Sequence, residues 1–214
     1  AAVGYAYQAR YHNFMAAPRL EHRAMARQEA ERARHLLRTR SGDVTAQQRI
    51  LVLREYAYAY KVSEMNGSLS DHERLARARS CFREALRESK TIRDTVLIAR
   101  ITHDIGNTFT DEAGRYNQEI PRSQLRLLVD SGLWHYRRSI ALLTAAGMGD
   151  GEDVMMDHLT IGLLYQNAYG RDSSVQAVAA YDRALRIILQ AAGRPPDFDP
   201  LAFEPRIANK AQMV

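Results

Sequence analysis

Apolar residues recur every three or four positions along most of the chain, and this spacing is typical of helices that bury one side. Turn signals interrupt the pattern at Ser41-Gly42-Asp43, at the glycines of 147–151 and at Gly193. Tyr56 to Tyr60 alternates like a strand, but the long flanking run of good helix formers favours a helix. The pattern predicts an all-α fold of about eight helices, paired as antiparallel hairpins at about 1–40, 45–90, 91–147 and 152–192.

A short motif occurs four times along the chain, with a small residue beside a large apolar one and a second large apolar residue three positions later. A second motif of small and apolar residues follows each copy. Small residues let two helices approach closely, and repetition of such a unit lets each helix pair bury its apolar side on the next pair. The first motif reads Val3-Gly4-x-x-Tyr7, Tyr56-Ala57-x-x-Tyr60, Ile105-Gly106-x-x-Phe109 and Ile161-Gly162-x-x-Tyr165; the second reads Ala26-x-x-x-Ala30-x-x-Ala33, Ala78-x-x-x-Phe82-x-x-Ala85, Gly132-x-x-x-Tyr136-x-x-Ser139 and Ala177-x-x-x-Tyr181-x-x-Ala184.

These two motifs resemble the signature of the tetratricopeptide repeat family, over roughly residues 1–192. The resemblance implies a tetratricopeptide-like right-handed solenoid whose first helices line a concave groove. Two features depart from the family. The small residues at 4, 57, 106 and 162 give steps of 53, 49 and 56 residues, where the family uses 34, and the proline that closes each family repeat is missing. An irregular bundle of eight helices is the alternative.

By the same resemblance, groove contacts lie three residues before and one residue after each small residue. The second copy offers Arg54 and Tyr58, and the third offers His103 and Asn107. The fourth copy is apolar at these positions, which argues against a clamp for a terminal carboxylate and favours a mixed groove for a helix or an extended segment. The alternative for His103 and Asn107 is that they satisfy local backbone groups.

The net charge of +5 rests on 27 arginines against 3 lysines, a bias that GC-rich coding also produces. Arg19, Arg23 and Arg27 follow one another at four-residue spacing, and such a basic patch could track nucleic-acid phosphates. Glutamates interrupt it, and Arg27 with Glu31 has the spacing of an ordinary ion pair on a helix surface. A solvated helix side or an acidic protein partner is the interpretation that the charges favour.

The chain lacks the motifs of metal and nucleotide chemistry. It has no His-Glu-x-x-His, its glycine loop is not followed by Lys-Ser/Thr, and no elbow motif marks a nucleophile. The single cysteine, Cys81, lies in a helical pattern and is expected to be buried. We therefore expect no catalytic residue, no metal, no cofactor and no small-molecule substrate.

The sequence also bears on the location of the protein and on the conformation of its C-terminal segment. No stretch approaches eighteen uninterrupted apolar residues, which excludes a membrane span, and the first fifteen residues lack the features of a secretory signal. We expect an intracellular protein of the cytoplasm or an organellar matrix, possessing an extended Pro-rich tail at 193–214. The leading hypothesis is a non-enzymatic protein–protein interaction scaffold or a structural subunit of a larger assembly. The alternative is an RNA-associated subunit of a ribonucleoprotein or organellar complex.

Overall fold

A computed structural model of the chain describes residues 2–15, 20–39, 44–62, 70–116, 120–169 and 173–193. Within these ranges all regular elements are helices and none is a strand. This confirms the prediction of an all-α fold with about eight helices for the described part of the chain. The helices are α1 (Ala2–Met15), α2 (Leu20–Thr39), α3 (Ala46–Val62), α4 (Asp71–Thr91), α5 (Thr95–Tyr116), α6 (Arg122–Ala145), α7 (Glu152–Tyr169) and α8 (Ser174–Ala191).

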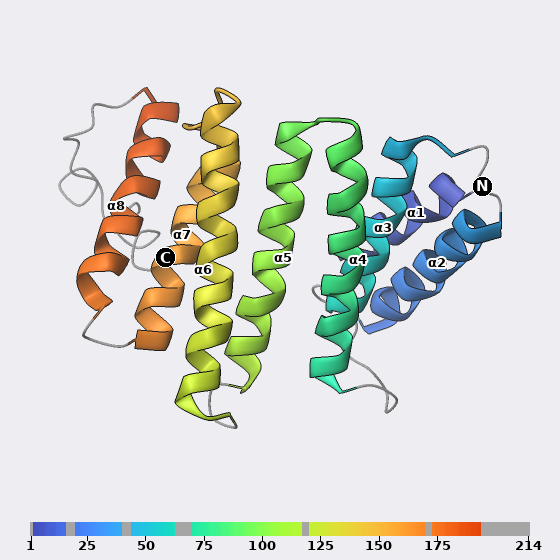
Figure 1. The fold of residues 1–214 in the computed structure, drawn as a ribbon, viewed down its shortest axis with the longest axis horizontal. Coiled ribbons are helices and arrows are strands. Elements are labelled where there is room, and N and C mark those ends of the chain that lie inside the picture. The colour runs from blue at the N-terminus through green and yellow to red at the C-terminus, as the bar shows by residue number, and fades with distance from the viewer. Residues whose placement is uncertain are drawn as a thin grey trace.

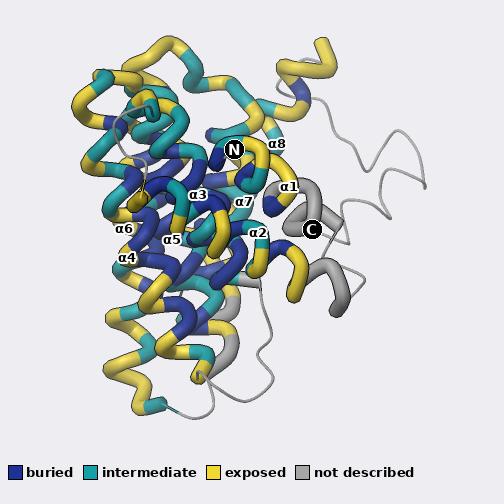
Figure 2. Tube along the Cα trace, turned by 90° about the vertical axis from the view of Figure 1, so that its right-hand side faces the viewer, coloured by how far each residue is buried: buried dark blue, intermediate teal, exposed yellow. Residues whose placement is uncertain are grey.

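The helices follow one another across the molecule in chain order, from α1 and α2 at one end to α8 at the other (Figure 1). Packing is most extensive within the pairs α1/α2, α3/α4, α5/α6 and α7/α8, and smaller contacts between α2 and α3, α4 and α5, and α6 and α7 join these pairs. Buried positions gather between the helices, while exposed positions follow the outer surface (Figure 2). Neighbouring helices therefore pack as the repeat pattern predicts. The tetratricopeptide-like right-handed solenoid and the boundaries of the hairpins remain predictions.

Local side-chain caps start several of the helices. The Thr45 hydroxyl accepts the Gln48 backbone N–H at 3.2 Å, and the Gln48 side chain accepts the Thr45 N–H at 3.0 Å. Ser70 and Glu73 form the same reciprocal box before α4, as their spacing predicts. Each box satisfies N–H groups that the first helical turn leaves unpaired. Gly193 follows α8 with a φ of +65°, the left-handed conformation expected of a glycine that ends a helix.

Small residues lie at the helix crossings in the third and fourth pairs. A Cβ atom added to Gly106 would lie 3.1 Å from the Cβ of His135 and 3.1 Å from the ring of Tyr136. A Cβ atom at Gly162 would lie only 2.5 Å from the ring of Tyr181. These glycines let α5 approach α6 and let α7 approach α8, which is the role that the first motif predicts for them.

The first copy of the motif does not have this role, and its assignment is wrong. Gly4 is exposed with no atom of the described residues near its missing side chain, and Tyr7 is 58% exposed. Among residues 2–9, where the side chains of α1 are described, the buried ones are Ala2, Ala6 and Ala9, of which the last two are fully buried. α1 therefore packs through a row of alanines. The motif selected Gly4 instead, because this helix carries several small residues and the motif does not tell which of them faces solvent.

A buried arginine joins α3 to α4. Arg74 is fully buried and donates to the backbone carbonyl of Tyr60 at 2.6 Å and to that of Lys61. Carbonyls in the last turn of a helix have no partner within the helix, so this guanidinium satisfies the end of α3. Its charge is balanced by the carboxylate of Asp71 at 2.7 Å.

Two predictions concern segments beyond these helix contacts. Among the helices that the structure describes, none is long and apolar enough to cross a membrane. The Pro-rich tail predicted for 193–214 lies, after Gly193, outside the described residues, so its extended conformation stays a prediction.

Candidate functional site

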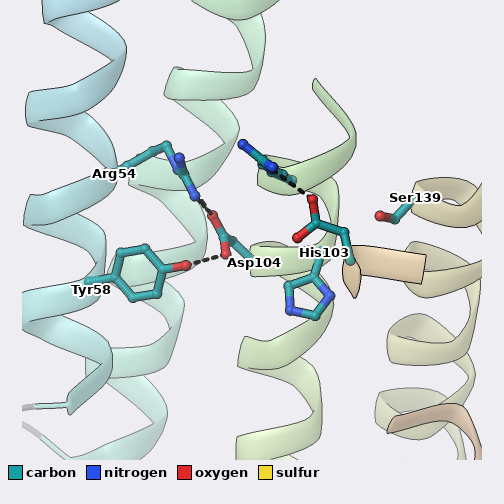
Figure 3. Close-up of a pocket in the computed structure, with 7 residues that line it drawn as sticks. Arg54, Tyr58, His103, Asp104 and Ser139 are labelled. Carbon is teal, nitrogen blue, oxygen red and sulfur yellow. Dashed lines mark hydrogen bonds and ion pairs between the residues drawn. The ribbon is translucent and has the colours of Figure 1, made fainter. Parts of the chain in front are cut away.

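The four predicted groove residues belong to a polar network that connects α3, α5, α6 and α7. Its first centre is Asp104, a carboxylate with only 3% of its side chain exposed. Arg54 donates to one oxygen of Asp104 through Nε at 3.1 Å and Nη2 at 2.8 Å. The Tyr58 hydroxyl donates to the other oxygen. Both predicted residues of α3 thus reach across to α5, where one buried carboxylate fixes them (Figure 3).

These contacts shift the proton affinities of both partners of Asp104. Burial lowers the pKa of Arg54, but the charge and hydrogen bond of Asp104, together with the charges of Tyr58 and Glu55, raise it overall above its usual range. Burial raises the pKa of Tyr58, and the neighbouring Asp104 carboxylate raises it further. Arg54 therefore stays a cation and Tyr58 stays a hydrogen-bond donor at any physiological pH.

The second centre is His103, which pairs with the fully buried carboxylate of Asp157 on α7. Their Nδ1 and Oδ1 atoms are 2.6 Å apart. Asn107 lies 2.8 Å from the other ring nitrogen, and the Tyr136 hydroxyl donates to the Asn107 amide oxygen at 2.8 Å. Burial lowers the pKa of His103, while the hydrogen bond and charge of Asp157 act the opposite way and leave it raised overall. His103 and Asn107 satisfy side chains of other helices rather than the local backbone groups that the sequence suggested as an alternative.

A pocket of about 200 Å³ opens beside these two centres. Arg100 of α5 and Asp153 of α7 form an ion pair of 2.8 Å in its wall, and both side chains are about half exposed. Ser139 of α6 lines the pocket from the opposite side (Figure 3). Its hydroxyl is buried and has no hydrogen-bond partner among the described residues. The complete lining is Arg54, Tyr58, Arg100, His103, Asp104, Ser139 and Asp153.

The geometry of the pocket suits recognition better than nucleophilic chemistry. The one hydroxyl without a partner, that of Ser139, is not bonded to a base, and the one imidazole, that of His103, already has a partner on each ring nitrogen. Burial raises the pKa of the Cys81 thiol to about 11, so this buried cysteine is protonated at neutral pH. In the part of the chain that the structure describes, no group of three or more His, Cys, Asp or Glu side chains could hold a metal ion.

The predicted basic patch is described only in part. Arg19 and the side chain of Arg23 lie outside the described residues. Arg27 forms the predicted ion pair with Glu31 at 3.0 Å, and its guanidinium also lies 5.4 Å from the ring centroid of Tyr60. The described member of the patch is therefore engaged with its own helix and with α3.

The carboxylates that organise the network could not be recognised from apolar periodicity. Asp104 and Asp157 are 2% and 0% exposed. A search for regularly spaced apolar residues does not predict that a carboxylate among them is buried. A usable signal was present, because Asp104 stands two residues before the small residue of its motif and Arg54 stands three before that of the preceding copy. First helices of successive repeats lie side by side in a stacked array, so opposite charges at neighbouring positions of the motif predict an ion pair between repeats.

Comparisons of the chain with protein-family models, with curated proteins and with solved structures find no match, so the architecture and the site are described from this chain alone.

Proposed function

We propose that the chain is a non-enzymatic protein-binding scaffold, or a structural subunit of a larger assembly, that holds a partner segment against α3, α5 and α7. The observation that supports this most is the convergence of polar side chains from these three helices on one pocket. Ion pairs between helices already hold Arg54, Arg100 and His103 in place. A surface whose side chains are ordered before binding loses less conformational entropy when a partner arrives.

Apolar side chains of α7 extend this surface beyond the pocket. Met156 follows the pocket residue Asp153 by three positions and is 45% exposed, and Leu163 lies two turns further along the same stripe at 42% exposure. The pocket wall therefore continues into an apolar edge. A partner segment with apolar side chains next to a polar one would match both parts.

The charges of the pocket indicate which polar group enters it. Arg54 pairs with Asp104, Arg100 with Asp153, and His103 with an aspartate of α7. A charged partner side chain would have to break one of these pairs, at the cost of exposing an unpaired group. A neutral amide or hydroxyl would enter the pocket without breaking any of these pairs. We propose Asn, Gln, Ser or Thr at the centre of the bound segment.

Replacement of the apolar edge tests the proposal. We expect Met156→Glu combined with Leu163→Glu to reduce recovery of the physiological partner at least about 10-fold, because each change buries a charge in the interface. The measurement is affinity purification of the tagged full chain from its native cells, with quantitative mass spectrometry of the proteins that co-elute.

The matched control is Leu127→Glu, which adds the same charge at a 68% exposed leucine of α6. Circular dichroism of each variant checks that the helices are retained. Equal recovery of every co-eluting protein with the double variant and with the wild-type chain would contradict the proposal, as would a loss caused by Leu127→Glu alone.

A further inference from the structure

The solvent-facing side of α6 carries an aromatic residue in an unusual position. Trp134, the single tryptophan of the chain, is 60% exposed. Its ring meets that of the neighbouring His135 edge to face, with centroids 4.8 Å apart. A large aromatic surface is thus left open to solvent, which is uncommon for a residue that only packs.

Contacts through α5 connect Trp134 to α4. The rings of His135 and Phe109 are stacked, with centroids 5.7 Å apart. The guanidinium of Arg79 lies 4.7 Å from the centroid of the Phe109 ring. Arg83 follows Arg79 by one helical turn, so it continues the same stripe of α4 toward α6. Consistent with this placement, burial lowers the pKa of His135 to about 4, and the charge of Arg83 adds to that effect.

Arg79 pairs with Glu112 of α5 at 2.5 Å, whereas the two arginines that follow it on this side of α4 have no acidic partner among the described residues. Arg83 and Arg87 are exposed. The glutamates that follow them in the sequence are engaged elsewhere: Glu84 pairs with Arg34 of α2 at 2.6 Å, and Glu88 pairs with Arg49 of α3 at 3.6 Å. The positive charge of α4 is left facing solvent.

α6 adds a third free arginine next to the tryptophan. Arg138 is exposed and stands one helical turn after Trp134. Asp130, the acidic residue within α6, accepts a hydrogen bond of 2.5 Å from Tyr169 of α7. Arg83, Arg87 and Arg138 therefore form no ion pair with another described residue. Together with Trp134 they make up what we call the α4/α6 face.

We propose that the α4/α6 face binds single-stranded nucleic acid, with a base stacked on the indole of Trp134 and phosphates paired with Arg83, Arg87 and Arg138. An open aromatic ring among unpaired arginines supplies the two interactions that hold single strands without strict sequence preference. None of the four residues of the α4/α6 face lines the pocket described above, so neither proposal depends on the other.

An acidic protein is the competing occupant of such a surface, and it would use the same charges. It would not require an exposed indole with an open face, because carboxylates gain little from stacking. The exposed ring of Trp134, one helical turn before Arg138, is the reason that we favour a nucleic acid.

The test uses the full chain, whose single tryptophan reports directly on the site. Labelled oligo(U) and oligo(dT) of about 12 nucleotides, within the usual size of such sites, are titrated while anisotropy and tryptophan emission are recorded. We expect binding by at least one of them, with quenching of the emission. Trp134→Ala should weaken the anisotropy affinity about 10-fold. Replacing the three arginines by glutamine should lower the slope of log K against log salt by about 2, since each phosphate contact contributes about 0.7.

Matched control variants distinguish binding at this site from non-specific attraction to the positive charge of the protein. Arg186→Gln removes an exposed arginine of α8, and Leu127→Ala truncates an exposed side chain of α6; both should leave the affinity within about twofold of the wild-type value. A poly-glutamate peptide that binds as tightly as the oligonucleotides, without quenching, would overturn the proposal in favour of an acidic protein. The absence of binding, or an affinity unchanged by the Trp134 and arginine variants, would also overturn it.

Discussion

Replacement of Asp104 by alanine is expected to lower the free energy of unfolding by about 3 kcal/mol. The substitution removes a carboxylate that is 2% exposed and leaves Arg54 and the hydroxyl of Tyr58 without their acceptor. We expect a decrease in stability at the low end of the range for broken buried ion pairs, because 23% of the Arg54 side chain is exposed to solvent. Urea unfolding followed by circular dichroism at 222 nm measures it.

Two controls show whether burial of the pair is the cause. Asp153→Ala removes the partner of Arg100 from a pair that is about half exposed, and it should cost less than about 1 kcal/mol. Arg54→Met combined with Asp104→Leu replaces the buried pair by apolar side chains and should recover much of the stability lost in Asp104→Ala. If Asp104→Ala and Asp153→Ala destabilised the protein equally, Asp104 would not be the centre of the network.

Gly106→Leu is expected to destabilise the protein by about 3 kcal/mol, because it overpacks the crossing of α5 and α6. The first added carbon would lie 3.1 Å from the Cβ of His135, an atom that cannot move without its backbone. The rest of the leucine side chain would then enter the space of Tyr136, which is fully buried. Thermal unfolding monitored by circular dichroism gives the comparison with the wild-type chain.

The same substitution at Gly4 is the control for this prediction. Gly4 also lies within a helix, but its missing side chain faces open space. Gly4→Leu should therefore leave stability unchanged or raise it by up to about 1 kcal/mol through helix propensity. A Gly106→Leu variant as stable as Gly4→Leu would show that close approach at residue 106 is not required.

Helix positions could be predicted closely because their signals are local. The capping box of Ser70 and Glu73 needs only its own residues to form, and Gly193 ends α8 through its own backbone conformation. The register of α1 could not be predicted in this way. Whether Gly4 or the alanines are buried depends on which side of α1 contacts α2 and α3. Because α1 has several small residues, its sequence is compatible with more than one orientation.

The candidate site was predicted only as a set of positions. Arg54, Tyr58, His103 and Asn107 do converge on one network, but whether a partner binds them remains a prediction. Their bonding to buried carboxylates depends on contacts between helices about fifty residues apart, which single-helix periodicity does not contain.

The exposed position of Trp134 could not be predicted from the sequence for a related reason. A tryptophan in an apolar stripe is usually buried, and the helical pattern of 122–145 offered no sign of which stripe faces α5. The rotation of α6 follows from the row of residues that it buries, among them Leu133 and Tyr136, and this row leaves Trp134 facing outward.

Site-specific photo-crosslinking tests the central claim, which is that the side of the array formed by α3, α5 and α7 recognises a protein. A benzophenone side chain introduced at Leu163 of α7 or at Leu127 of α6 samples the two sides of the molecule at exposed leucines. We predict that the partner is crosslinked from Leu163 and not from Leu127. A partner crosslinked from Leu127 alone, or equally from both positions, would contradict the account.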